Sequence, residues 1–496
     1  MDSLFAFTDS QVHPLDITLI IIYLLGILIF GLYVGKGVKN SSDFFLAGKT
    51  LSWWVVGLSI IGSNIGSNDY VGAAGSAYKI GIAQANFEWI GAIPAMILAA
   101  FLFIPYYWKA GVYSIPEYLG LRYNQGVRFI SASVLSVFTV LMVGAFLWST
   151  ALMLKTYLGW PIYFSILVSA FVVGVYTATG GLKAVTITDT VQVFIMFAGA
   201  FGLMYLGIEK SGGFDSFLNK INTNHPDHLK AFLPANHLEF PWPGVVLGLG
   251  LVLSPAYWCT SQVILQRTLG AKSQWDGQAS MIFAAFAKTL VPFLIIFPGF
   301  LALVLITEPL EYPDQALPWV VKNVLPPGLS GLLFVSFIAA LQSSVDSTLN
   351  STATMFTRDI VGVLRKEKDD AFDLRLGKIV TTVALILGMA VAPLTSMFAG
   401  IYVFIQEMLS LFQGPMFALV LWGILSRKPT SIGGLTTIIL GLLFAFILNR
   451  TGVNMLYVAF YSFTGSSLIL FTVSYFTEKK TNSELQNLTM YEEKKK

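Results

Sequence analysis

Between Ser59 and Gly75 the chain reads SIIGSNIGSNDYVGAAG, an apolar run interrupted by four glycines and by several Ser, Asn and Asp residues. A break in a membrane helix frees backbone N–H and C=O groups that lipid cannot satisfy. Such breaks occur where the backbone is buried in protein or lines a cavity, and discontinuous helices point to the binding sites of secondary transporters. The stretch therefore predicts a transporter whose binding site lies at mid-membrane.

The composition agrees with a membrane protein. Of 496 residues, 55% are hydrophobic and 11% are charged, more apolar surface than one soluble core can cover. Runs long enough to cross about 30 Å of hydrocarbon give thirteen candidate spans. They are residues 15–35, 52–77, 85–108, 129–154, 160–180, 185–208, 244–265, 279–306, 328–357, 377–397, 400–425, 430–449 and 453–476. We expect an all-α polytopic membrane protein in which residues 1–496 form a single transmembrane domain.

The basic residues predict the orientation. Most of them, Arg267 and Lys272 among them, fall in loops that lie on one side if the N-terminus is outside the cell. By the positive-inside rule that side is the cytoplasm, and an odd number of spans also puts the C-terminus there. The first apolar run follows Met1-Asp2 and has its positive flank behind it, which indicates a retained helix and not a cleaved signal peptide. We expect a multi-pass protein of the plasma (cell inner) membrane.

Several classes of function have no support. The basic residues are explained by the membrane topology, so nucleic-acid binding is not indicated. The single cysteine, Cys259, cannot form an internal disulfide. No nucleophile–base pair, Walker loop or metal cluster is recognisable, so we do not expect an enzyme, and no obligatory protein partner is evident. The lipid bilayer is one expected partner.

Six charged residues fall within the predicted spans, where each costs about 2.5–3.5 kcal/mol and is a candidate for function. They are Asp69, Glu88, Asp189, Lys288, Asp346 and Glu407. Lys288 lies between apolar neighbours and requires a carboxylate partner, for which Glu88 and Asp69 are candidates. The alternative is that Lys288 extends to the membrane surface.

A second break is predicted in the seventh span, where Ser254-Pro255 lies mid-segment. Proline removes a backbone donor and clashes with the preceding turn. The two broken spans are the second and the seventh. A repeat of five spans makes the two halves cross the membrane in opposite directions, which is the pattern of an inverted repeat. We expect the repeats to cover residues 52–208 and 244–425.

Several longer motifs occur in order along the chain. They are SNIGS from Ser63, FEW from Phe87, GGLKAV from Gly180, TDTVQ from Thr188, YWCTSQ from Tyr257, the pair Ser343-Ser344, NSTAT from Asn350 and IQE from Ile405. Over nearly its whole length the chain resembles the sodium/solute symporter family, in particular its sodium/glucose and sodium/galactose branch. The resemblance implies a LeuT-like core, made of spans two to six and seven to eleven, with one helix before it and two after.

The resemblance also implies a function and the ions that drive it. The expected function is sodium-coupled import, by alternating access, of a sugar such as glucose or galactose, and the alternative is myo-inositol or another non-hexose small solute. The implied sodium ligands are the carbonyls of Gly62, Ile65 and Ala340 and the hydroxyls of Ser343 and Ser344. Without that context, the two serines would be interpreted as helix packing.

A possible second sodium site is implied at Asp189, Asp346, Ser347 and Thr186. Asp346 places a carboxylate where the family is expected to have a hydroxyl or a small residue. The alternatives for Asp346 are a protonated side chain and a bond to a neighbouring helix.

The solute is expected at Asn64, Asp69, Glu88, Tyr257, Trp258, Lys288 and Gln406, where hydroxyl-pairing groups meet an aromatic face. Tyr257 is implied as the inner gate. Asp69 departs from the family, whose sugar transporters have Gln or His there. It could bond two vicinal hydroxyls, pair with Lys288 or favour an amino sugar.

Overall fold

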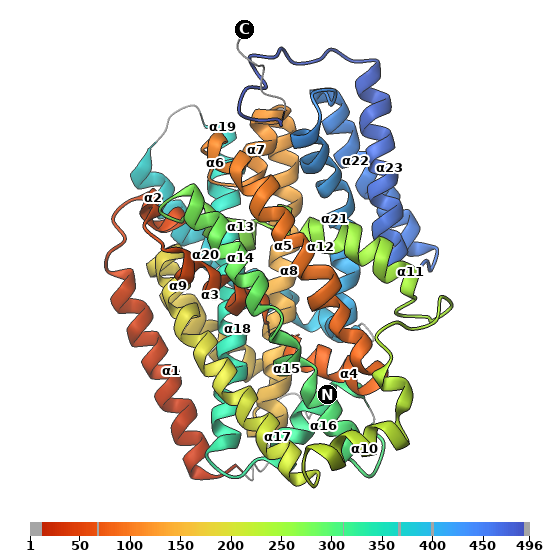
Figure 1. Ribbon diagram of the computed structural model, residues 1–496. Helices are drawn as coiled ribbons and strands as arrows, with labels where there is room; N and C mark the ends of the chain where they lie inside the picture. Colours follow the sequence, from red (N-terminus) through yellow and green to blue (C-terminus); the bar gives the residue numbers. More distant parts are fainter. Residues whose placement is uncertain (1–11, 67–68, 311, 366–368, 398–400, 491–496) are drawn as a thin grey trace.

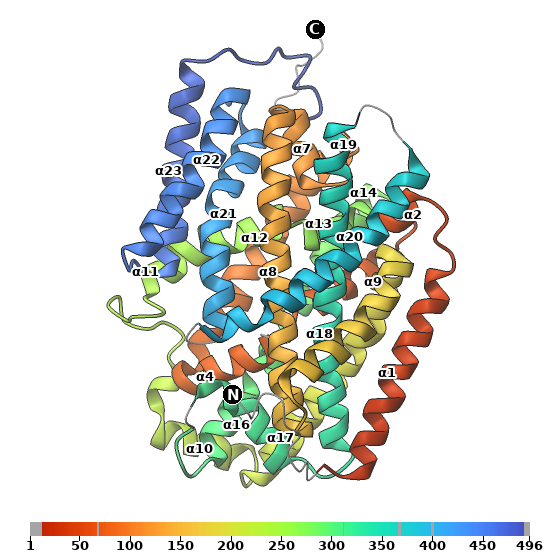
Figure 2. The ribbon, with the colours of Figure 1, turned by 180° about the vertical axis from the view of Figure 1, so that it is seen from behind.

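The computed structural model describes residues 12–66, 69–310, 312–365, 369–397 and 401–490, and these ranges are almost entirely helical, with isolated β-bridges only (Figures 1 and 2). Ten helical stretches of this described chain are long and apolar enough to cross a membrane, and a bent helix pair adds an eleventh. One of the ten stretches folds back on itself and contains two predicted spans, and the second predicted span is divided into two half-helices. The described residues of the thirteen predicted spans therefore lie in helices apart from short breaks, and the all-α polytopic prediction is confirmed.

The helices of the first half are α1 (Pro14–Gly35), α2 (Ser41–Leu46), α3 (Trp53–Asn64), α4 (Ala74–Ile80), α5 (Ile93–Leu98), α6 (Ile104–Ala110), α7 (Ile115–Arg122), α8 (Gln125–Leu158), α9 (Ile162–Lys210) and α10 (Phe214–Asn224). Those of the second half are α11 (Trp242–Gly244), α12 (Ser254–Thr260), α13 (Gln262–Leu269), α14 (Gln274–Ala287), α15 (Val291–Ile295), α16 (Phe297–Leu305), α17 (Ala316–Val324), α18 (Leu329–Thr354), α19 (Gly362–Leu364), α20 (Asp370–Val391), α21 (Ile401–Leu425), α22 (Ser431–Arg450) and α23 (Met455–Tyr475). In both views α1 and the pair α22–α23 flank the bundle at opposite edges.

The second span is broken, as its glycines and polar residues predict. Helix α3 ends at Asn64, Ile65 leaves the helical conformation (φ −84°, ψ 87°), and a π-helical turn over Asp69–Ala73 leads into α4. The two half-helices therefore meet in the middle of the bundle.

Helix α9 contains both the fifth and the sixth span. A straight helix of its 49 residues would be about 74 Å long, more than twice the thickness of the bilayer. The chain turns at Gly181, whose φ of 52° and ψ of −154° are not helical. A Cβ at this position would collide with the carbonyl of Phe44 in α2, so the turn requires glycine.

The seventh span is broken at a different residue from the one that we predict. Pro255 lies in the first turn of α12, directly after a π-helical stretch, Val245–Leu253, which accommodates the missing N–H. The chain leaves the helix at Ser261 (φ −69°, ψ 120°), between α12 and α13. The prediction of a broken seventh span is correct, and the prediction of the break at Pro255 is wrong.

The eighth span bends by 51° between α14 and α15. Pro292 explains the bend, because a proline cannot donate to the residue four positions before it and its ring clashes with that residue's carbonyl. That residue is Lys288, which follows the last residue of α14. The bend therefore places the ammonium group where two short helices meet.

Helix α18 is the axis of the bundle. It packs against α1, α3, α8, α9 and α20, and most of its 26 residues are buried. Several of these are polar, and polar groups away from water need partners on the neighbouring helices. The polar face of α18 therefore predicts where the helices exchange hydrogen bonds.

The two ends of the bundle differ. We call the end with α2, α7 and α19 the α7 end and the opposite end, with α10 and α17, the α10 end (Figure 1). After α23 the chain crosses the α7 end, where the hydroxyl of Tyr118 donates to the carbonyl of Leu488 (2.7 Å) and the amide of Met490 donates to the carbonyl of Ile424 (2.9 Å). This tail fastens α7 to the end of α21.

Candidate functional site

The break in the second span frees the two carbonyls that the sequence assigns to sodium. In a continuous helix, the amide of Gly66 would donate to Gly62, and the amide of Asp69 to Ile65. In the structure, the Gly66 amide donates to the carbonyl of Asn64 (3.1 Å) and to Oδ2 of Asp69 (2.8 Å), and the Asp69 amide donates to the carbonyl of Gly66 (3.1 Å). The carbonyls of Gly62 and Ile65 thus lose their helical donors.

The residues just before the break lie against the polar face of α18. The hydroxyl of Ser344 lies 3.3 Å from the carbonyl of Ser63 and 3.1 Å from that of Ala340. The hydroxyl of Ser343 lies 3.3 Å from that of Ser63, and a Cβ built on Gly62 would lie 3.2 Å from it. The predicted ligands thus come from two facing helices and carry no full charge. Carbonyls of an unwound helix and the negative end of α3 suit Na⁺, so the residues present fit the predicted ion.

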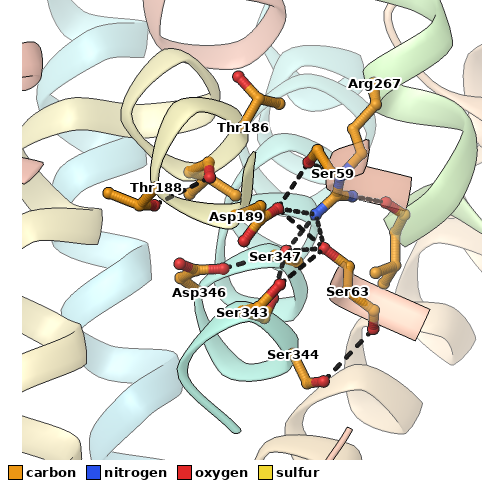
Figure 3. Close-up of polar contacts among 12 residues, drawn as sticks. Ser59, Ser63, Thr186, Thr188, Asp189, Arg267, Ser343, Ser344, Asp346 and Ser347 are labelled. Carbon is orange, nitrogen blue, oxygen red and sulfur yellow. Dashed lines mark hydrogen bonds and ion pairs between the residues drawn. The ribbon is translucent and has the colours of Figure 1, made fainter. Parts of the chain in front are cut away.

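Beside this site lies a buried cluster of charges and hydroxyls, which we call the arginine cluster (Figure 3). Arg267 of α13 is its centre and is only 1% exposed. Its Nε donates to the hydroxyl of Ser59 (2.7 Å), and its Nη2 lies 3.4 Å from Oδ2 of Asp189 and donates to the hydroxyls of Ser63 and Ser347. The sequence prediction of Arg267 as a cytoplasmic loop residue is wrong, because these partners draw the guanidinium into the bundle.

Two acidic residues belong to the arginine cluster. Oδ2 of Asp189 accepts from the hydroxyls of Ser59 (2.5 Å) and Ser63 (3.0 Å), whereas its Oδ1 has no hydrogen-bond partner among the described residues. Asp346 accepts from the hydroxyls of Tyr176 (2.7 Å) and Ser347 (3.0 Å). Two carboxyl groups thus share the cluster with one guanidinium, and with both of them ionised the three side chains carry one excess negative charge.

Thr186 takes a smaller part in this arrangement than the sequence implies. Its hydroxyl donates to the carbonyls of Leu182 (3.0 Å) and Lys183 (3.3 Å), one turn earlier in α9. This back-bonding is the usual choice of a buried threonine in a helix.

All seven residues predicted to bind the solute line one cavity of about 100 Å³. The predicted residues are Asn64, Asp69, Glu88, Tyr257, Trp258, Lys288 and Gln406, and the lining also includes Ser63, Phe87, Ala92, Met142, Phe146, Leu249, Leu253, Ser254, Ile405, Leu409 and Gln413. We call it the solute cavity. It is enclosed by the broken second and seventh spans, the third span, α8 and α21, and by Lys288 at the end of α14.

An ion pair crosses the solute cavity. The ammonium of Lys288 donates to Oε2 of Glu88, and both residues are buried. The same ammonium lies 5.6 Å from the ring centroid of Trp258, a cation–π distance. The pairing of Lys288 with Glu88, one of the two predicted partners, is present, and Lys288 does not extend to the membrane surface.

Tyr257 separates the solute cavity from a smaller, mostly apolar cavity of about 40 Å³, and it lines both. The amide of Asn64 lies 3.5 Å from its hydroxyl, which connects the two broken helices. The second cavity also touches Gln262, whose side chain bonds to the backbone of Tyr113 and Ile115 near α7. Tyr257 therefore stands between the solute cavity and the α7 end.

Gln413 is a polar residue of the solute cavity to which the sequence prediction gives no role. Gln413 lines the cavity seven residues after Gln406, two turns along α21, so the spacing alone could have identified it. Its Oε1 is buried and has no hydrogen-bond partner among the described residues.

A cavity at two broken helices, next to an oxygen-rich pocket suited to a small cation, defines a cation-coupled secondary transporter. Comparison with known proteins gives the family. The model of the sodium:solute symporter family matches residues 44–441. The sodium/glucose cotransporter of Vibrio parahaemolyticus is 34% identical over 469 residues, which are 89% of this chain and 86% of that protein. The chain belongs to the sodium:solute symporter family.

Two further proteins are similar to this chain over most of its length. Sodium/myo-inositol cotransporter 2 of Mus musculus is 31% identical over 482 residues, 90% of this chain and 71% of that protein. A sodium-coupled sialic acid symporter, solved in a substrate-bound outward-open state, superposes with a TM-score of 0.85 at 21% identity and covers 94% of this chain and 99% of that one. The fold is therefore the LeuT-like fold that the resemblance implies. The chain is a multi-pass, sodium-coupled solute symporter, and its relatives are transporters.

Proposed function

We propose that this symporter imports a hexose, or a closely related polyol such as myo-inositol, together with sodium. The observation that carries the proposal is the solute cavity, in which seven separated sequence positions converge. Relatives named as glucose and as myo-inositol cotransporters are almost equally similar to this chain, which supports the polyol class more strongly than any one member of it.

The lining of the solute cavity suits a polyhydroxylated ring. Asn64 and Gln406 carry both donors and acceptors, and the Lys288–Glu88 pair adds charged ones. Tyr257 and Trp258 stand edge to face, with 5.3 Å between ring centroids, and offer apolar surface to the face of a sugar ring. A few placed polar groups on an aromatic wall are typical of small-molecule sites.

Sodium is the co-substrate of this proposal. The carbonyls of Gly62, Ile65 and Ala340 and the hydroxyls of Ser343 and Ser344 hold it. Each sodium that enters down a potential of 100 mV supplies about 2.3 kcal/mol in addition to its concentration gradient.

The arginine cluster is a second cation site in the same proposal. Arg267 neutralises one of its two carboxylates, so one positive charge more would balance Asp189 and Asp346. The free Oδ1 of Asp189 offers a ligand for it, and Ser347 another, whereas Thr186 would have to turn from its own helix.

Transport requires the solute cavity to open alternately to the two sides. We assign the α10 end to the outside of the plasma membrane and the α7 end to the cytoplasm, as the basic residues predict. The repeats, residues 52–208 and 244–425, rock against each other, and Tyr257 moves aside to open the cavity toward the smaller one on its cytoplasmic side.

Uptake into proteoliposomes tests the proposal. Labelled glucose, galactose and myo-inositol are each supplied with an inward sodium gradient, with an equal potassium gradient, and with sodium equal on both sides. We expect accumulation of at least one of the three, and only with the sodium gradient. Sodium-independent accumulation, or none of any polyol with a sodium gradient, would contradict the proposal.

The second cation site has its own measurement, the number of positive charges that enter per solute. We expect two in the wild-type protein and one in Asp346→Asn, which keeps the side-chain shape and removes the charge. A ratio of one in both proteins would contradict a second site.

A further inference from the structure

Asp69 is the one charged residue lining the solute cavity for which the structure records no ion pair. The cavity is lined by three charged side chains, and Lys288 pairs with Glu88. Asp69 is partly exposed to the cavity, and the amide of Gly66 donates to its Oδ2 at 2.8 Å. With all three side chains ionised, the lining carries one excess negative charge.

That charge stands at mid-membrane, where an unbalanced charge is costly. Asp69 begins the helical segment after the break, and a negative charge is favoured in the first turn of a helix. A single amide donor and a helix terminus compensate a full charge only in part. The excess negative charge of the solute cavity therefore favours a ligand that itself carries a positive charge.

The pairing of Lys288 with Glu88 leaves two of the three sequence interpretations of Asp69. Vicinal hydroxyls would bond to the carboxylate without balancing its charge, and they would have to share Oδ2 with the amide of Gly66. A protonated amine gives hydrogen bonds and charge together, and charge-assisted hydrogen bonds are about twice as strong as neutral ones.

A second residue of the cavity points to the same ligand. Oε1 of Gln413 is a buried acceptor without a donor among the described residues. Gln413 thus adds an acceptor without a donor, buried just behind the cavity surface, to the lining that it shares with Asp69. An ammonium group has three donors and no acceptor, so it matches a wall with acceptors in excess.

We propose that the preferred solute is a sugar or cyclitol that carries a protonated amine, such as a hexosamine. Its ammonium group binds Asp69, and its hydroxyls bind Asn64, Gln406 and the Lys288–Glu88 pair. The inference rests on the proposed function, because it assumes that the solute cavity binds a polyol.

Competition for sodium-driven uptake of labelled glucose tests the inference. The competitors are D-glucosamine, which carries an ammonium group, glucose, and N-acetyl-D-glucosamine, whose nitrogen is an uncharged amide. We expect D-glucosamine to inhibit at concentrations about ten- to hundredfold lower than unlabelled glucose does, the range of a hydrogen bond to a charged group. We expect N-acetyl-D-glucosamine to have no such advantage. Labelled D-glucosamine should itself accumulate with the sodium gradient and bring in one positive charge more per molecule than glucose.

The outcomes separate this inference from the proposed function. Sodium-driven glucose uptake that D-glucosamine inhibits no better than glucose does would overturn the amine preference and leave the polyol symporter intact. If no polyol and no amino sugar accumulates with sodium, both are overturned.

The variant Asp69→Asn identifies the residue responsible. We expect the preference for D-glucosamine over glucose to fall to about one, because the amide keeps the shape and removes the charge. Asp215→Asn, on an exposed residue of α10, removes the same charge outside the cavity and should keep the wild-type preference. The preference is a ratio within one preparation, so a poorly folding variant does not mimic its loss. A preference retained in Asp69→Asn would overturn the assignment to Asp69.

Discussion

The arginine cluster and the solute cavity contain the same set of charges, two carboxylates and one basic group. In the arginine cluster Asp189, Asp346 and Arg267 are at most 1% exposed, and hydroxyls from α3, α9 and α18 surround them. In the solute cavity Lys288 pairs with Glu88, whereas Asp69 faces open space. In the arginine cluster the protein's own groups thus bond three of the four carboxylate oxygens, all but Oδ1 of Asp189. In the solute cavity Asp69 is left open toward the cavity.

The comparison distinguishes buried charges that hold the helices together from buried charges that bind a ligand. Buried charges that hold helices together need partners on every side. A charge that binds a ligand must keep one side free. The arginine cluster should therefore respond to mutation mainly in stability and the solute cavity mainly in affinity.

Replacing Arg267 should have the largest effect. Arg267→Met leaves Asp189 and Asp346 buried without a counter-charge, and breaking a buried ion pair costs about 3–5 kcal/mol. We expect a marked fall of the midpoint of thermal unfolding in detergent, together with loss of sodium-driven uptake. Arg375→Met, on an exposed position of α20, is the control and should leave both nearly unchanged. A wild-type midpoint in Arg267→Met would show that the cluster does not hold the helices together.

Lys288→Met tests the solute cavity in the same way. Glu88 loses its partner but keeps contact with the cavity, so we expect a loss of stability of about 1–3 kcal/mol and solute uptake at least tenfold weaker in kcat/KM. Adding Glu88→Gln should restore the midpoint of unfolding and not the uptake. If the double variant recovered uptake as well, the ion pair would have only a structural role.

Ser344→Ala removes one hydroxyl next to the freed carbonyls. We expect the sodium concentration for half-maximal uptake to rise about five- to tenfold, the value of roughly 1 kcal/mol for one polar contact, with little change in stability. Thr348→Ala is the matched control, because its hydroxyl bonds back to the carbonyl of Ser344 one turn away in α18. An equal rise in both variants would mean that the effect comes from the helix and not from a ligand.

Gly62→Ala should have the smallest effect. The new Cβ would lie 2.9 Å from Cγ2 of Val193 and 3.2 Å from the hydroxyl of Ser343, so α3 has to move by a few tenths of an ångström. We expect the sodium concentration for half-maximal uptake to rise two- to threefold, which corresponds to about 0.5 kcal/mol. Gly202→Ala in α9 has nothing within 4 Å and should be neutral or slightly stabilising. A response to sodium unchanged by Gly62→Ala would show that α3 adjusts freely.

Much of this arrangement can be predicted from the sequence, for physical reasons. Apolar runs of membrane length give the spans, and the cost of Lys288 in lipid requires a nearby carboxylate. The break near Gly62 is predictable because glycines and short polar side chains occur together there. The order of the motifs, through the family resemblance, then assigns distant positions of the chain to one cavity.

The parts that the sequence does not predict depend on three-dimensional contacts. Pro255 marks the seventh span as irregular, but a π-helical stretch accommodates it and the chain breaks at Ser261. Arg267 lies within the short amphipathic helix α13, and only the fold brings Asp189 and the hydroxyls to it. Gln413 differs from these, because its spacing of seven residues from Gln406 places both on one side of α21.

The backbone N–H of Gly66 connects the proposed sodium site with the solute cavity. The amide of Gly66 is withheld from the carbonyl of Gly62, a proposed sodium ligand, while it bonds to Asp69, a proposed solute ligand. The same amide shares one peptide group with the carbonyl of Ile65, another proposed sodium ligand, so a solute that draws on Asp69 alters the electron density that Ile65 can offer to the ion. Thermodynamic linkage makes this influence mutual, since an ion that changes the solute's affinity by some factor has its own affinity changed by the same factor. In this protein a single peptide group can therefore couple the binding of sodium to the binding of the solute.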